Sequence, residues 1–106
     1  MIPKLEVISE VKVTDNNELH IKMEGSGHSA YQYIYREAKG VYWLNDLASF
    51  KFGPSKNWSV VETYRHVIQT VKEGLNLDLQ LSEQTNWKNI APQDRELIEL
   101  ENMPRT

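Results

Sequence analysis

The stretch Ser59–Leu75, SVVETYRHVIQTVKEGL, decides the fold class of this chain. Ser59 and Glu62 have the spacing of a capping box, in which each side chain accepts a hydrogen bond from a backbone N–H of the first turn. The apolar residues that follow share one side of a helix, and Gly74 fits the left-handed position that commonly ends one. The stretch therefore predicts an amphipathic surface helix of about fifteen residues, with Glu62 and His66 paired on its solvent side.

Alternating polar and apolar residues precede this helix, as expected for strands that bury one face. The first strand is predicted to carry its apolar side on Leu5, Val7, Ser9, Val11 and Val13, with Ile8 breaking the alternation. The turn-forming residues 15–17 join it to a second strand with Leu19, Ile21 and Met23 on one face. Residues 30–37 predict a third strand that places three rings on one face, Tyr31, Tyr33 and Tyr35. Shorter strands are expected at 41–44 and around Phe50 and Phe52.

The chain beyond the helix predicts one more strand and one more helix. Leucines at 75, 77, 79 and 81 alternate with polar residues, and their side is expected to lie in the core. Pro92 suits the first position of a short acidic helix. The predicted fold class is α+β: an antiparallel sheet of about five to six strands, one long amphipathic helix packed on it, and a short C-terminal helix.

Length and composition limit the classes of function that this chain can have. The 106 residues predict a single domain spanning residues 1–106, and the absence of cysteine excludes disulfide, zinc–thiolate and thiol-nucleophile chemistry. A net charge of −3 argues against general affinity for nucleic-acid backbones, so no nucleic-acid partner is expected. The longest apolar run, Val41–Leu44, is far too short to span a membrane, and residues 1–10 do not resemble a signal peptide. The expected location is the cytoplasm.

Aromatic residues form the densest feature, since seven of the ten lie between Tyr31 and Phe52. Rings of this kind either fill the space between sheet and helix or form a surface for a small ligand or a second copy of the chain. Arg36 and His28 are the nearest groups able to add a polar contact. The candidate ligand-binding or interface residues are therefore Tyr31, Tyr33, Tyr35, Tyr42, Trp43, Arg36 and His28.

Two other function classes stay open beside this non-enzymatic binding domain. One is a small enzyme with His28 as general acid or base, partnered by Glu24, Glu37 or a tyrosine hydroxyl. The other is an acidic protein that binds a basic protein partner through residues 94–101. The three histidines have no metal-ligand spacing, so neither a metal nor a cofactor is expected.

Ordered aromatic landmarks also resemble a known group. They are Ala30–Glu37, Gly40–Trp43, Trp58-Ser59, Tyr64-Arg65-His66, Leu79–Leu81 and Thr85-Asn86-Trp87. Over residues 28–90 the chain resembles uncharacterised proteins of bacterial integron gene cassettes. The resemblance implies a stand-alone cytoplasmic bacterial protein from a pool of mobile genes, often a homo-oligomer. It carries over no functional residues.

Overall fold

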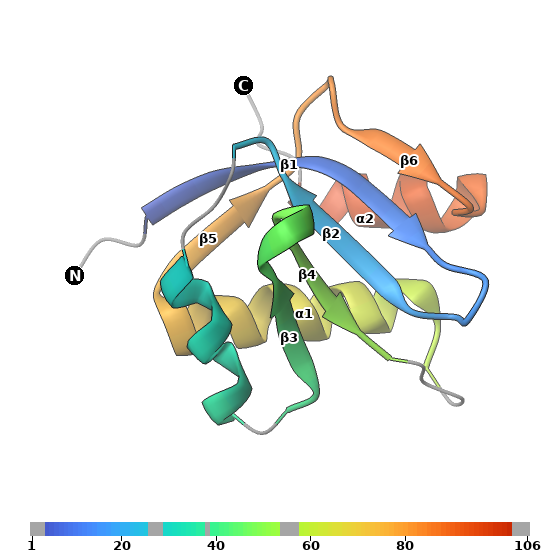
Figure 1. Cartoon of the computed structure of the whole chain (residues 1–106). Coiled ribbons are helices and arrows are strands. Elements are labelled where there is room, and N and C mark those ends of the chain that lie inside the picture. The colour runs from blue at the N-terminus through green and yellow to red at the C-terminus, as the bar shows by residue number, and fades with distance from the viewer. Residues whose placement is uncertain (1–3, 26–28, 38, 54–57, 103–106) are drawn as a thin grey trace.

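The strands form one mixed sheet in the order β3-β4-β2-β1-β5, and β6 pairs with the second half of β1 (Figure 1). The computed structural model describes residues 4–25, 29–37, 39–53 and 58–102. The strands are β1 (Lys4–Val13), β2 (Leu19–Met23), β3 (Val41–Leu44), β4 (Ser49–Phe52), β5 (Leu77–Gln80) and β6 (Asn86–Lys88). The helices are α1 (Val60–Leu75), α2 (Pro92–Asn102) and two 3₁₀ helices, η1 (Ser29–Glu37) and η2 (Asn45–Leu47). The α+β prediction is confirmed, and the pairings among β1 to β4 are antiparallel, whereas β5 and β6 run parallel to β1.

The long helix α1 begins where the sequence predicted. The Ser59 hydroxyl accepts a hydrogen bond from the Glu62 N–H at 3.2 Å, and the Glu62 carboxylate accepts one from the Ser59 N–H. The helix crosses one face of the sheet (Figure 1) and buries its apolar side against it. The helix does not end at Gly74, because Asn76 takes the left-handed conformation, with φ of 53°. Gly74 lies inside the helix instead, where η1 packs closely on it.

The predicted apolar face of β1 is wrong in its first half. Ile8 and Val11 are fully buried, whereas Leu5 is 56% exposed. The register with β2 shifts between Ile8 and Glu10, so an irregularity at this point changes which side of the strand faces the core. A period of two cannot continue through such a bulge, and the residue that breaks the alternation, Ile8, is a core residue.

Residues 30–37 do not form the predicted strand but the 3₁₀ helix η1, which lies beside the outer edge of β3 (Figure 1). With about three residues per turn, Tyr31 and Ile34 share one side, and both are buried. The tyrosines at 33 and 35 stay exposed. The helix thus closes the core at the edge of the sheet, where a further strand would leave a new open edge.

The C-terminal part adds one strand that the sequence did not signal. The short β6 runs parallel to β1, and the Thr85 hydroxyl before it donates a 2.7 Å hydrogen bond to the Ile8 carbonyl. The leucine side of β5 is buried and α2 begins at Pro92, both as predicted. In the described ranges, no helix is long and apolar enough to cross a membrane.

Candidate functional site

The predicted aromatic surface is divided between the core and the solvent. Tyr31, Trp43 and Phe50 form one buried cluster, with the Trp43 ring centroid 5.2 Å from that of Tyr31 and 4.8 Å from that of Phe50. The nearby Tyr31 hydroxyl, followed by the Glu6 carboxylate, raises the pKa of Lys4. Tyr31 and Trp43 therefore act as core residues between the sheet, η1 and α1.

The other predicted residues lie outside that core. Tyr33, Tyr35 and Tyr42 are each 44–54% exposed, on η1 and β3. The Arg36 guanidinium lies over the Tyr33 ring, 4.4 Å from its centroid, which holds both side chains on the surface of η1. His28 lies outside the described residues. A single tyrosine face does not form, because the 3₁₀ helix turns successive rings in different directions.

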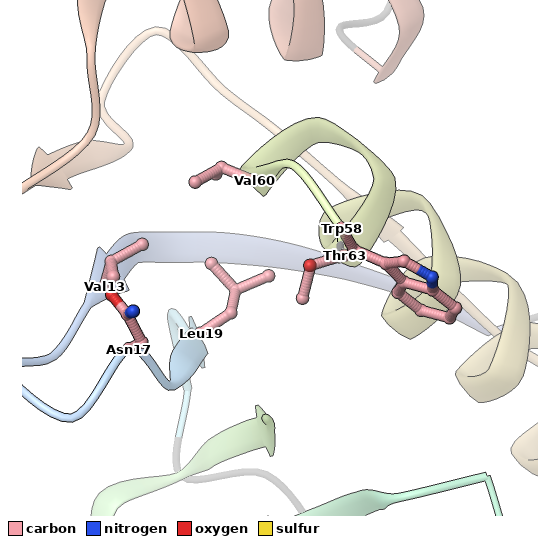
Figure 2. A pocket seen from close by; sticks show the side chains of 6 residues that line it. All are labelled: Val13, Asn17, Leu19, Trp58, Val60 and Thr63. Atoms are coloured by element: carbon pink, nitrogen blue, oxygen red, sulfur yellow. The ribbon is translucent and has the colours of Figure 1, made fainter. Parts of the chain in front are cut away.

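A hollow that the sequence did not signal lies between the β1–β2 hairpin and the start of α1 (Figure 2). Its volume is about 110 Å³, and it is lined by Val13, Asn17, Leu19, Trp58, Val60 and Thr63. Val13, Leu19 and Val60 contribute aliphatic side chains from β1, β2 and α1, and Trp58 contributes its ring. Asn17 and Thr63 place polar atoms at its wall, as the sticks in Figure 2 show. A small-molecule site commonly combines apolar side chains, which give contact area, with polar groups that orient the ligand.

A second, wider hollow of about 540 Å³ shares three of these residues, Val13, Asn17 and Val60. It continues toward the start of α2 and is also lined by Asn89, Ile90, Ala91 and Asp94. Because the two hollows share a wall, we treat them as one site, the hairpin–helix groove. Asp94 is the one titratable side chain among the described residues that line it.

Two asparagines shape the groove through their backbones. Asn17 and Asn89 both have positive φ, at 62° and 57°, a conformation that asparagine tolerates better than most residues. The Asn89 amide donates a 2.9 Å hydrogen bond to the Val13 carbonyl, which ties the end of β6 to the end of β1. The Thr63 hydroxyl donates to the Ser59 carbonyl at 3.0 Å, which leaves the acceptor lone pairs of its oxygen available.

Trp58 forms one end of the groove and is held by two other rings. Its indole stacks on Phe52 at 5.5 Å between centroids and meets the His66 imidazole edge-on at 5.0 Å. The His66 Nε2 lies 2.8 Å from the Lys39 carbonyl. His66 therefore packs with the rings of Phe52 and Trp58, and the predicted pair with Glu62 does not form. Trp58 keeps 42% of its surface exposed. A ring that is fixed on one side and open on the other suits contact with a ligand.

The acidic helix α2 is partly neutralised within the chain. Arg65 of α1 donates two hydrogen bonds to the Glu101 carboxylate, and Arg95 pairs with Glu99. The Glu101 contact raises the pKa of Arg65. In the described part of the chain, no group of three or more acidic or histidine side chains could hold a metal ion.

Comparison with known proteins agrees with the resemblance drawn from the aromatic landmarks. The chain is similar to a solved structure from the mobile metagenome of the North West Arm sewage outfall, integron cassette protein Hfx_Cass5. The identity is 22%, the match covers 88% of this chain and 90% of that chain, and the TM-score is 0.41. No protein-family model and no curated protein matches the sequence.

Proposed function

We propose that this protein binds a small aromatic ligand that carries a hydrogen-bonding group, and that the ligand lies in the hairpin–helix groove. The observation that carries the proposal is the hollow of about 110 Å³, lined by both apolar and polar groups, with the exposed, ring-supported indole of Trp58 at its end. Trp58 replaces the tyrosines as the central contact residue. The proposal keeps a non-enzymatic binding role and moves it from the sheet face to the groove.

The polar groups of the groove favour binding over acid–base catalysis. General acid–base chemistry needs a positioned titratable group close to a second polar group that orients it. The groove offers one carboxylate, on Asp94, at its wide end, and amide and hydroxyl groups elsewhere. Such groups orient a ligand through hydrogen bonds, and the apolar walls from Val13, Leu19 and Val60 supply contact area.

A ligand screen tests the proposal. Benzyl alcohol, p-cresol and indole serve as probes, and ¹H–¹⁵N spectra report the indole N–H signals of the three tryptophans. We expect a probe to shift the Trp58 signal and to raise the melting temperature. Trp58→Ala and Val60→Phe, which remove the ring and fill the hollow, should each abolish the rise. Tyr35→Ala, an exposed aromatic change on η1, serves as the control and should preserve it.

Solution mass by light scattering separates this proposal from an interface role. A probe response that survives both Trp58→Ala and Val60→Phe places the ligand elsewhere and overturns the proposal. A dimer with no probe response instead favours the homo-oligomer contact through Tyr33, Tyr35, Tyr42 and Arg36, which stays a prediction.

A further inference from the structure

One row of side chains crosses five strands on the sheet face opposite α1. The register pairs Tyr42 of β3 with Lys51 of β4, Lys51 with His20 of β2, His20 with Lys12 of β1, and Lys12 with Lys88 of β6. Their strand neighbours Val41, Trp43, Ile21 and Val11 are buried toward the helix, so the row itself faces away from it. We call these five residues the basic row.

The basic row is electrostatically costly. Side chains directly opposite one another on neighbouring strands lie about 5 Å apart, and like charges in such pairs destabilise a sheet. Two acids offset part of the repulsion: Glu18 lies 3.0 Å from the Lys51 amine, and Glu10 lies 3.2 Å from the Lys88 amine. Lys12, which lies between His20 and Lys88, has no ion pair within the described residues. Lys12 therefore lies beside Lys88 without a carboxylate of its own, and its ammonium group is available to an anion from outside the chain.

His20 occupies the middle of the row in an unusual state. Its Nε2 atom is buried and has no hydrogen-bond partner among the described residues, and the Glu18 carboxylate lies 3.7 Å away. Burial, followed by the charges of Lys51 and Lys12, lowers the pKa of His20, although Glu18 acts in the opposite direction. The ring is therefore neutral at pH 7. An anion placed over the row would favour its protonation and so gain a further positive charge.

The shape of the row favours an extended ligand over a compact one. Neighbouring strands lie about 4.8 Å apart, so four spacings make a track of about 19 Å. The hollows of the hairpin–helix groove are lined by other residues. At one end of the track, Tyr42 exposes 52% of its surface beside Lys51. An aromatic ring at the end of a line of lysines combines a stacking surface with charges for phosphates.

We propose that the basic row binds a short single-stranded nucleic acid, with phosphates on Lys51, Lys12 and Lys88 and a base stacked on Tyr42. The net charge of −3 does not oppose this, because the register brings lysines from three distant segments, β1, β4 and β6, to one face. An acidic polypeptide would use the lysines but not the ring. The exposed Tyr42 therefore favours nucleic acid over an acidic protein segment.

Fluorescence anisotropy with labelled twelve-nucleotide single strands of RNA and DNA tests the proposal at several salt concentrations. We expect log K to fall with log salt at a slope of about −2, from about −0.7 for each of three phosphate contacts. Lys12→Ala should reduce the slope to about −1.4. Tyr42→Ala should weaken binding about fivefold or more, and Tyr42→Phe, which keeps the ring, should restore it.

Matched controls separate the row from general charge effects. Lys72→Ala removes an exposed lysine from α1, on the other side of the sheet, and should leave both affinity and slope unchanged. Circular dichroism and melting temperature establish that each variant folds. Trp58→Ala should not alter oligonucleotide binding, so failure of the groove proposal is distinguishable from failure of this one.

Two results would overturn the proposal. One is the absence of measurable oligonucleotide binding at low salt by the folded wild-type protein. The other is equal competition by a twelve-residue polyglutamate, together with full binding by Tyr42→Ala, because the surface then takes acidic polypeptides through charge alone.

Discussion

A β-carbon on Gly74 would lie 2.9 Å from Cδ1 of Ile34, which is closer than such atoms approach in folded proteins. Ile34 is buried on the inner side of η1, and Gly74 lies in the last turn of α1. The glycine therefore allows the 3₁₀ helix to pack directly on the α-helix. This contact closes the core beside β3.

Gly74→Ala tests this close approach. At an exposed helix position the change from glycine to alanine stabilises by about 1 kcal/mol. Although Gly74 is itself exposed, we expect the free energy of unfolding to fall by about 1 kcal/mol instead, because the added β-carbon would collide with Ile34 and Glu37 of η1 and overpacking costs about 1–3 kcal/mol. Urea denaturation measures this change in the free energy of unfolding. Ile34→Val removes one of the two clashing groups, the other being the Glu37 side chain, so the double variant should be at least about 0.5 kcal/mol more stable than additivity predicts. A rise in stability for Gly74→Ala alone would contradict the packing described here.

The N-terminal cap of α1 gives a second prediction. Ser59→Ala removes the hydroxyl that accepts from the Glu62 N–H. We expect a loss of about 1 kcal/mol in the free energy of unfolding, with an unchanged denaturant slope. Ser59→Asp keeps an acceptor at the cap and should remain within about 0.5 kcal/mol of wild type. Equal losses in both variants would show that the hydroxyl does not act as the cap.

Ala48 offers a stabilising substitution. It has φ of 49° and ψ of 46°, a left-handed conformation that costs a residue with a β-carbon about 1–2 kcal/mol. Ala48→Gly should raise the free energy of unfolding by about 0.5–1 kcal/mol, after the extra freedom of glycine in the unfolded chain is subtracted. As a control, Ala30→Gly in η1 should lower stability by a similar amount, since its helical backbone gains nothing from glycine. Thermal and urea unfolding measure both variants.

His20 predicts how stability depends on pH. Because burial lowers its pKa in the folded protein, the unfolded chain binds the proton more readily. The contribution of His20 to the free energy of unfolding is therefore complete above the pKa of about 6.5 that histidine has in the unfolded chain. This contribution decreases as the pH falls through that value. Glu18, whose own pKa is lowered chiefly by its hydrogen bond to Lys51, stays charged throughout this range.

The matched variant is His20→Gln, which cannot titrate. Wild type should lose more stability than this variant between pH 7 and pH 5, as measured by urea denaturation at each pH. The other histidines are present in both proteins, so their titration cancels in the comparison. Parallel losses would show that His20 has the same proton affinity in the folded and unfolded chains.

The two helices show what local pattern predicts well. Ser59 and Glu62 signal the start of α1 through their own spacing, and Pro92 marks the start of α2. These signals act within one turn, so distant residues do not change them. The end of α1 was predicted less well because Gly74 has two uses: as a left-handed cap, or as a close-contact residue inside a helix. Only the positions of Ile34 and Glu37 on η1 distinguish these two uses.

The candidate site was harder to predict because the residues that form it are distant from one another in the sequence. Trp58 lies next to the helix cap in sequence, but its neighbours in the groove come from the hairpin, at Val13, Asn17 and Leu19. The tyrosine alternation of 31–35 satisfies a strand pattern. The 3₁₀ helix nevertheless buries Tyr31 with Ile34, since a spacing of three places that pair on the core side.

The sequence by itself determined the α+β class, the positions of both helices and most strands, because hydrophobic period and capping chemistry are local properties. The tertiary structure alone decided which aromatic rings are core, which indole borders a groove, and which lysines stand side by side. Those relationships depend on strand register and on the bulge in β1. A shift of one residue in the register of β1 would turn Lys12 toward the core, and the lysines of the basic row would no longer share one face.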